Sequence, residues 1–466
     1  MARRDILSPD FRTAPWWWEG FTPPEDPPAE LPRAVDVLIV GGGYAGVHCA
    51  LTLAEAGRRP LVLDAERLGW GASTRSGGQV TGGVNVGKIP GGGNAMEGAA
   101  TRRQTILRDS AAGMRHLLDL IERHQIQCGW HATGRLTALW TDAHWESWEK
   151  KLDDLNRFTD ADARMIPPER MREEVGSDAY AGGVLIGRAG HLHPARLYGG
   201  LLDAARRAGV RAHGGTRVTG IARVPGGWRV ETSRGPVQAD TVVLATNGYT
   251  GRLVGDFHRQ VIPVTTHMIA TEELPEDLAQ RIMPQDRAVS ETRRVVNHYR
   301  LSPDGRRLLF GGRARFFPAK EEVTAAILHR QMVRRFPELA GIRVTHSWGG
   351  RVAVPFDYMP HIGEHEGIHY AMGCNGSGVV MMNWLGHSLA RKILSGGKEP
   401  INAFDAGPMP THPLYHGTPW FLPVVGTYYQ IRDRLDHRPA APARTGQEDT
   451  PAIGSSSSER KADHHA

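Results

Sequence analysis

The chain has 466 residues, which is too long for one small core, so we expect two closely joined domains with terminal extensions. A hydrophobic content of 40% and a charged content of 23% are ordinary for a globular protein. The sequence contains no run of about 18 apolar residues, so we predict neither a membrane-spanning helix nor membrane insertion. The net charge is +6, but the arginines are spread along the chain instead of forming a basic stripe, so nucleic-acid binding is not indicated.

Residues 1–34 form a Pro-rich segment that we expect to be an irregular leader. It lacks the apolar core of a secretory signal, and the three cysteines lie too far apart to form a disulfide framework, so we expect a cytoplasmic protein. The leader contains Trp16, Trp17 and Trp18, which are costly to expose to water. We expect them to pin the leader onto the domain surface; a role at a substrate entrance is the alternative.

A dinucleotide-binding pattern follows the leader. The apolar run Val37–Val40 predicts a central parallel strand, and Val47–Ala56 predicts the helix after it. Gly41, Gly43 and Gly46 stand between them in G-x-G-x-x-G spacing. The first permits a tight turn, the second a close approach of the backbone to a pyrophosphate, and the third close packing of helix and strand. The helix start offers free N–H groups to the phosphates.

The second strand of this unit is predicted at Pro60–Leu63, with Asp64 at its tip. An acid at this position accepts hydrogen bonds from ribose hydroxyls. A carboxylate would repel a 2′-phosphate, so FAD or NAD is favoured over NADP.

The segment after Asp64 is rich in Gly and Ser and can present many backbone N–H groups to an anion. The run from Leu63 to Gly78, LDAERLGWGASTRSGG, resembles the second FAD segment of the D-amino-acid-oxidase-like superfamily of FAD-dependent oxidoreductases. That superfamily includes glycine and sarcosine oxidases. Residues 291–313 resemble its γ-glutamylputrescine-oxidase-like branch.

The resemblance implies an α/β fold: a Rossmann-like FAD-binding domain, with a central parallel sheet and helices on both faces, and an interleaved antiparallel-sheet substrate domain. We expect the FAD-binding domain at 35–100, 180–255 and 346–400, and the substrate domain at 101–179 and 256–345. Residues 401–436 are expected to form an ordered extension and 437–466 a disordered tail.

Two later segments repeat the cofactor pattern. An apolar strand ending in Ala-Thr-Asn-Gly at residues 245–248 resembles a second approach of strand to cofactor, and two separated signatures favour FAD over NAD. A glycine-rich turn at 373–378 then precedes a helix at Val379–Leu394, whose start can stabilise negative charge on a reduced flavin. Relatives commonly have Gly-His-Gly in this turn, whereas this chain has Gly-Ser-Gly, so contacts through that histidine do not transfer.

The expected cofactor contacts come from these segments, with Val218 added because a valine there meets the adenine in the family. They are Gly41, Gly43, Tyr44, Ala45, Gly46, Asp64, Ala65, Gly71, Ala72, Ser73, Arg75, Gly78, Gln79, Val218, Thr246, Asn247, Gly373, Asn375, Gly376, Ser377 and Gly378. The block in which some relatives tether the flavin contains no cysteine, so we expect non-covalent FAD.

Catalytic residues are harder to predict, because the flavin carries the redox chemistry. Arg351 is the first candidate, since related oxidases use an arginine in this turn for the substrate carboxylate; an ion pair with Asp357 is the alternative. Arg313 is the candidate cation for oxygen reactivity. Tyr249 and His267 are expected to line the pocket, although a histidine on an apolar strand is more often a core residue.

No metal site is predicted, because His191 and His193 have no third ligand near them in the sequence; His193, before Pro194, is expected at a helix start. The resemblance implies an FAD-dependent oxidoreductase that oxidises the C–N bond of a small amine or amino acid to an imine, with O2 as acceptor giving H2O2. Alternatives are a dehydrogenase that reduces a quinone or carrier, a flavin-dependent RNA-modification enzyme, and a non-catalytic flavoprotein. The substrate and the oligomeric state stay open.

Overall fold

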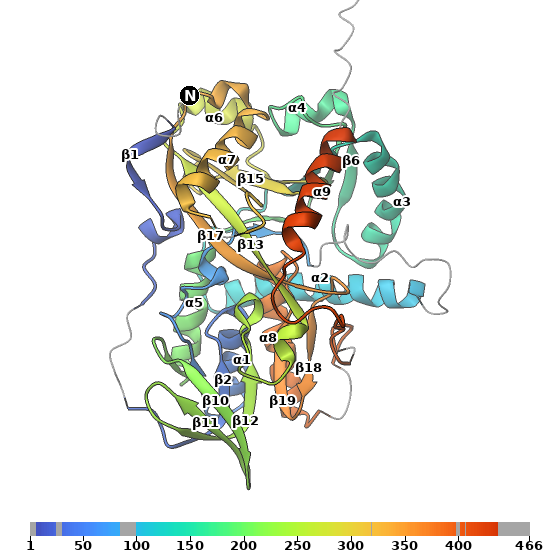
Figure 1. Ribbon diagram of the computed structural model, residues 1–466. Coiled ribbons are helices and arrows are strands. Elements are labelled where there is room, and N and C mark those ends of the chain that lie inside the picture. Colours follow the sequence, from blue (N-terminus) through green and yellow to red (C-terminus); the bar gives the residue numbers. More distant parts are fainter. Residues whose placement is uncertain are drawn as a thin grey trace, which may run out of the picture.

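A computed structural model describes residues 6–24, 30–83, 99–317, 319–397, 401–405 and 407–436. Its two large sheets occupy different halves of the molecule, and helix α2 (Ala99–Arg123) runs between them (Figure 1). The tail predicted at 437–466 lies outside the described residues.

The first sheet is built on five parallel strands, in the order β9-β3-β2-β12-β19. The apolar run that predicted the central strand lies in β2, and Val37 to Ile39 are fully buried, as the interior of a parallel sheet requires. Strands β10, β11 and β18 extend the sheet with antiparallel pairs. The bounds are β2 (Ala34–Val40), β3 (Pro60–Leu63), β9 (Arg211–His213), β10 (Val218–Val224), β11 (Gly227–Thr232), β12 (Val237–Leu244), β18 (His361–His365) and β19 (Ile368–Met372).

Helices cover one face of this sheet. Val37 and Ile39 point into a core built from α1 (Tyr44–Glu55), α5 (Pro194–Arg207) and α8 (Gly378–Leu394). The opposite face, with Leu38 and Leu61, packs against β11 and residues 253–261, and that cluster contains no α-helical residue among those described. Helices on both faces were expected. Large apolar side chains on the β10–β12 strands, such as Trp228, fill the place of the second helical layer.

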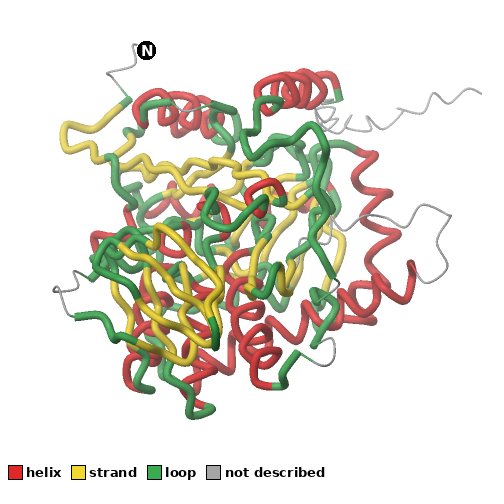
Figure 2. Tube along the Cα trace, turned by 60° about the horizontal axis from the view of Figure 1, so that its bottom comes forward, coloured by secondary structure: helices red, strands yellow, loops and turns green. Residues whose placement is uncertain are grey.

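The second sheet has the order β1-β17-β13-β16-β15-β14-β5-β7-β6, and its pairs are antiparallel except β1–β17 and β14–β5. A parallel sheet joined to an interleaved, largely antiparallel one confirms the predicted fold class. Figure 2 shows the two groups of strands with helices around them. The bounds are β1 (Leu7–Arg12), β5 (Arg135–Ala138), β6 (Ala163–Ile166), β7 (Gly183–Ile186), β13 (Val261–Thr271), β14 (Ala288–Glu291), β15 (Asn297–Leu301), β16 (Leu308–Gly312) and β17 (Val344–Pro355).

The remaining elements surround the two sheets. None of the helices within the described ranges has both the length and the apolar surface needed to cross a membrane. The helices and short strands are α3 (Asp142–Phe158), α4 (Met171–Glu174), α6 (Glu276–Ile282), α7 (Glu321–Val333), α9 (Leu422–Leu435), β4 (Gln79–Val80) and β8 (Gly190–His191), with short 3-10 turns at Trp16–Glu19, Ala72–Thr74, Pro168–Arg170, Asn247–Tyr249, Phe257–Arg259 and Pro337–Leu339.

The leader is more ordered than its composition predicts. Leu7–Arg12 forms strand β1 on the edge of the second sheet, where an irregular segment was expected. Trp17 is fully buried, and its indole N–H donates to the Ser76 carbonyl at 2.8 Å. The indole N–H of Trp18 donates to Thr74 Oγ1 at 3.0 Å. The prediction that the tryptophans pin the leader to the domain is confirmed.

Candidate active site

The turn between β2 and α1 depends on two glycines. Gly41 has φ of 108°, and a Cβ there would lie 2.7 Å from the Ala245 carbonyl oxygen. A Cβ at Gly46 would lie 1.9 Å from the Gly41 carbonyl oxygen. Any side chain at either position would push the helix away from the strands.

A cavity of about 660 Å³ opens in front of this turn. Helix α1 begins there with no side-chain cap, and the Tyr44 N–H donates to Ser73 Oγ at 3.0 Å. The Ser73 hydroxyl therefore occupies one N–H of the first turn, and the rest of the positive helix end, which follows a glycine without a side chain, faces the cavity and can receive an anion. Apart from this turn, the cavity is lined by residues 63–66, 69–73, 216–219, 244–247 and 249–253, with Arg351 and Met382.

Asp64 lies at the tip of β3, on the wall of this cavity. Its Oδ2 accepts from the Gly42 N–H at 2.8 Å and its Oδ1 from the Glu66 N–H at 2.9 Å. Burial raises the pKa of Asp64 although these two hydrogen bonds favour the charged form. Both oxygens keep lone pairs with which they can accept from the hydroxyls of a ribose.

A second cavity of about 540 Å³ shares Ala72 and Arg351 with the first. Its walls come from residues 75–79, from the second sheet, and from the turn that starts α8. The first residues of α8, Gly378 and Val379, line this cavity, and the helix has no side-chain cap, so its positive end faces the cavity. Asn375 Oδ1 in this turn is buried and has no hydrogen-bond partner among the described residues, so it is available to a ligand N–H.

These two cavities suit the FAD that the sequence predicts. The first offers a helix start and a ribose acceptor for the adenosine diphosphate half, and the second offers another helix start and the free Asn375 oxygen for a polar ring. No cysteine lines either cavity within the described ranges. Cys374 is buried and its sulfur accepts from Asn247 Nδ2 at 3.4 Å.

The structure brings most of the expected cofactor residues to these cavities. Tyr44 faces the first cavity through its backbone, because its buried hydroxyl points away and donates to the Pro194 carbonyl. Gly46 and Gly373 line neither cavity. The first cavity is lined by Gly41, Gly43, Tyr44, Ala45, Asp64, Ala65, Gly71, Ala72, Ser73, Val218, Thr246 and Asn247. The second is lined by Ala72, Arg75, Gly78, Gln79, Asn375, Gly376, Ser377 and Gly378.

The four candidate catalytic residues separate into two groups. Tyr249 lines the first cavity, Arg313 the second and Arg351 both, and the Arg351 guanidinium lies 5.5 Å from the centre of the Tyr249 ring. His267 lines neither. The pocket face of β13 carries Val264, Thr266 and Met268, so His267 points to the opposite side of the strand.

Asp357 does not pair with Arg351. It accepts from His361 Nε2 at 3.0 Å instead. Burial alone would raise the pKa of Asp357, but the hydrogen bond and charge of His361 hold it below the ordinary value. The structural alternative for Arg351, an ion pair with Asp357, is therefore not formed.

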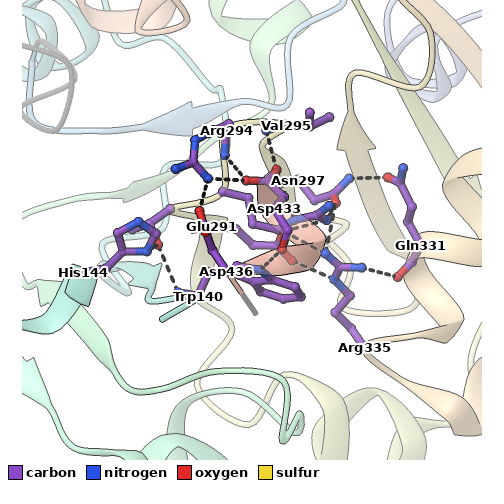
Figure 3. Close-up of polar contacts among 12 residues, drawn as sticks. Trp140, His144, Glu291, Arg294, Val295, Asn297, Gln331, Arg335, Asp433 and Asp436 are labelled. Atoms are coloured by element: carbon purple, nitrogen blue, oxygen red, sulfur yellow. Dashed lines mark hydrogen bonds and ion pairs between the residues drawn. The ribbon is translucent and has the colours of Figure 1, made fainter. Parts of the chain in front are cut away.

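Cationic side chains outnumber acidic ones around the second cavity. Glu291 is its one carboxylate among the described lining residues, and it is already engaged. It accepts from Arg335 Nε at 2.7 Å and Nη2 at 2.9 Å (Figure 3). It also accepts from the Tyr180 hydroxyl at 2.9 Å. The lining cations are Arg75, Arg135, Lys151, Arg293, Arg294, Arg313 and Arg351.

Arg135 is the cation that the sequence did not reveal. Its guanidinium contacts hydroxyls, Thr137 Oγ1 at 3.1 Å and Ser290 Oγ, and no described carboxylate lies within ion-pair distance. Burial lowers the pKa of Arg135 to about 10. An arginine that begins a short apolar strand was the available signal, but nothing local shows that β5 borders the cavity.

Comparisons with known proteins identify the family of the chain. The model of the FAD dependent oxidoreductase (DAO) family matches residues 36–392. Gamma-glutamylputrescine oxidoreductase of Escherichia coli (strain K12) is 31% identical over 86% of this chain and 93% of that protein. Glycine oxidase of Geobacillus kaustophilus is 24% identical over 80% of this chain and 95% of that protein.

Solved structures share the fold. The crystal structure of glycine oxidase from Geobacillus kaustophilus superposes with a TM-score of 0.66 at 22% identity, covering 82% of this chain and 99% of that one. The crystal structure of L-proline dehydrogenase from P. horikoshii superposes with a TM-score of 0.65 at 20% identity, covering 80% of this chain and 97% of that one. With the family match and the two cavities, these findings show that the chain belongs to the DAO family and is an FAD-dependent oxidoreductase.

Proposed function

We propose that this enzyme oxidises the C–N bond of an amine or amino acid that carries a carboxylate, such as γ-glutamylputrescine or a secondary amino acid. The observation that carries this proposal is that the second cavity has cations without a carboxylate partner among the described residues, above all Arg135, whereas Arg293 and Arg294 pair with Asp433. A fork of N–H donors without a carboxylate partner suits a substrate carboxylate. The names of the relatives, which act on γ-glutamylputrescine and glycine, support the same class.

Bound FAD would accept the two electrons as the C–N bond becomes a C=N bond, and water would then release an aldehyde or keto product and an amine. In this proposal Arg135 holds the substrate carboxylate, with Arg351 a second cation at the junction of the cavities. The surrounding cations disfavour an ammonium group, so they favour the neutral amine, the form from which a hydride leaves. His298 lines the cavity as a neutral imidazole, because burial lowers its pKa to about 4.

We further propose non-covalent FAD and O2 as the electron acceptor. Arg313 lines the second cavity, and burial lowers the pKa of its guanidinium. A cation beside a reduced flavin favours electron transfer to oxygen by stabilising developing negative charge. A dehydrogenase that reduces a quinone or carrier protein is the competing hypothesis. One H2O2 per substrate in air supports the oxidase, while slow turnover in air that a quinone accelerates supports the dehydrogenase.

Anaerobic mixing of the yellow holoenzyme with single amines tests the reaction class. The panel is γ-glutamylputrescine, putrescine, sarcosine, glycine, and D- and L-amino acids. We expect a carboxylate-bearing amine to bleach the flavin. Bound flavin that no amine bleaches would contradict the proposal and favour the RNA-modification or non-catalytic alternatives. Denaturation that releases all the flavin into solution would support non-covalent binding.

A further inference from the structure

Three histidines from three different helices meet behind the cofactor cavities. His48 lies on α1, His116 on α2 and His387 on α8, and their candidate ligand nitrogens all lie within 4.8 Å of one another. His48 is 1% exposed, and the other two are half-buried, so one side of the cluster can be reached by an ion. None of the three lines either cavity.

The hydrogen bonds of His48 define which of its nitrogens is free. Asn383 Nδ2 donates to the Val379 carbonyl at 2.8 Å, which orients the amide so that Asn383 Oδ1 faces His48 Nδ1 at 3.0 Å. The amide oxygen accepts only, so His48 Nδ1 carries the proton. The lone pair of His48 Nε2 therefore points into the cluster, where His116 Nε2 lies 3.0 Å away.

His387 has a comparable outer partner. Its Nδ1 lies 3.1 Å from Thr52 Oγ1, one helical turn along α1 from His48. Metal-ligating histidines usually use their second nitrogen in this way, to orient the ring. Burial lowers the pKa of all three imidazoles, to about 4 for His116 and about 3 for His387, so all three are in the neutral form that binds metals.

A second group of potential ligands lacks this arrangement. His131, His191 and Asp286 also lie together, but His191 Nε2 donates to the Asp286 backbone carbonyl at 2.8 Å and so carries a proton. That nitrogen has no lone pair for a metal. Asp286 Oδ2 also accepts from His131 Nδ1 at 3.1 Å, so His131 and one carboxylate oxygen are engaged with each other, while His191 Nδ1 and Asp286 Oδ1 have no partner among the described residues.

We propose that His48, His116 and His387 form a binding site for a divalent transition-metal cation of the zinc class, with a water in the fourth position. Tetrahedral Zn²⁺ with nitrogen ligands at about 2.0–2.1 Å needs ligand nitrogens roughly 3.3 Å apart, close to the separation between His48 and His116. The three ligand nitrogens lie within 4.8 Å of one another, and the ring centres of His116 and His387 lie 4.1 Å apart at an interplanar angle of 31°. Metal binding therefore requires these rings to turn so that their lone pairs converge on the ion. The site is independent of the proposed substrate.

The consequence of occupancy is structural. Helices α1 and α8 both begin at the cofactor cavities, and the metal would tie them to each other and to α2. A ligand that binds only the folded protein raises its stability by mass action. Metal binding is therefore expected to raise the thermal midpoint of the holoenzyme.

The test uses FAD-loaded full-length protein stripped of metal by a chelator. We expect one Co²⁺ per chain to bind with the intense d–d absorption of tetrahedral cobalt, at wavelengths longer than the flavin bands, and Zn²⁺ to displace it. His116→Ala is expected to weaken Co²⁺ binding at least about 100-fold. The matched control His124→Ala removes a histidine just beyond the end of α2, paired with Glu55 at 3.5 Å, and is expected to bind as the parent does.

Thr52→Val covers the case in which His116→Ala fails to fold. It keeps all three ligands and the side-chain shape, removes only the outer partner of His387, and is expected to weaken binding about 10-fold. The flavin spectrum and the metal-free thermal midpoint report folding. Absence of tetrahedral cobalt absorption in the parent protein, or equal binding by the parent and by whichever variant folds, would overturn the proposal.

Discussion

The arginines that line the second cavity determine what it can bind. Charge in a low-dielectric site is costly unless a partner compensates it. Glu291 already has Arg335, whereas Arg135 has only hydroxyl partners among the described residues. The site therefore retains positive charge, which an anionic substrate group would balance.

Replacing Arg135 is expected to weaken the use of a carboxylate substrate without loss of the cofactor. A hydrogen bond to a charged group contributes about 1.5–3 kcal/mol, so Arg135→Ala should lower kcat/KM roughly 10- to 100-fold. Arg135→Lys keeps the charge but loses the planar fork, so it should recover only part of this loss. Steady-state kinetics and the flavin spectrum measure the two effects.

Arg164→Ala is the matched control for this prediction, because Arg164 belongs to β6 of the same sheet and is exposed. It should leave kcat/KM unchanged. An Arg135→Ala enzyme with parental kinetics would show that this guanidinium serves only to hold β5 and β14 together.

At the scale of single elements, the start of α5 depends on a histidine. His193 Nδ1 accepts from the Arg196 N–H at 3.2 Å, which confirms the prediction of a helix-start residue. Burial, followed by the charges of Arg196 and Arg300, lowers the pKa of His193 to about 3. The cap therefore works only while this nitrogen is unprotonated.

This cap makes stability fall in acid. Between the unfolded pKa of about 6.5 and the folded pKa of about 3, the unfolded chain binds a proton that the folded chain does not, so unfolding becomes easier as the pH falls. One such group can change the free energy of unfolding by at most about 1.4 kcal/mol per pH unit. His193→Asn caps without titrating, so it should lose less stability than the parent between pH 6.5 and 5. The free energies of unfolding come from denaturant titrations at each pH. An equal loss of stability in the two proteins between pH 6.5 and 5 would contradict this role.

Helix α9 is attached through one buried carboxylate. Asp433 is 1% exposed and accepts from the backbone N–H groups of Arg294 and Val295 at 3.0 and 2.9 Å (Figure 3). Arg294 Nη1 also lies 3.3 Å from it. These partners belong to the loop between β14 and β15, which lines the second cavity.

Asp433→Ala should release α9, because it leaves two N–H groups without an acceptor. Removing one member of a buried ion pair costs about 3 kcal/mol or more. Limited proteolysis should cut the C-terminal segment of this variant faster than that of the parent. Asp436→Ala, which removes a more exposed partner of Arg294 just beyond the end of α9, is the control and should be cut at nearly the parental rate.

The sequence predicted elements with strong local patterns and missed those that depend on distant partners. The strand before Gly41 and the helix after Gly378 follow from apolar runs and glycine spacing. Strand β1 was missed, because its polar sequence is ordered only by pairing with β17, far along the chain. Arg135 was missed for the same reason, since its position depends on β5 pairing with β14.

For the whole molecule, function depends on how the two sheets are placed. The parallel sheet supplies the first cavity, and the second cavity forms where residues 75–79 and the start of α8 meet the other sheet. Most residues that line the first cavity lie in local motifs, so they could be predicted from the sequence. The proposed substrate-binding surface is assembled from β5, β13 and β14 across a sheet, which no local pattern describes.

The central claim is that this flavoenzyme oxidises an amine whose carboxylate is held by the cationic cavity. Anaerobic stopped-flow reduction of the flavin by γ-glutamylputrescine and by putrescine tests it most directly, because the two share the amine and only the first carries a carboxylate. We predict rapid, saturable bleaching by γ-glutamylputrescine, much slower bleaching by putrescine, and a loss of this difference in Arg135→Ala. Equal reduction by both amines in the parent enzyme would contradict the account.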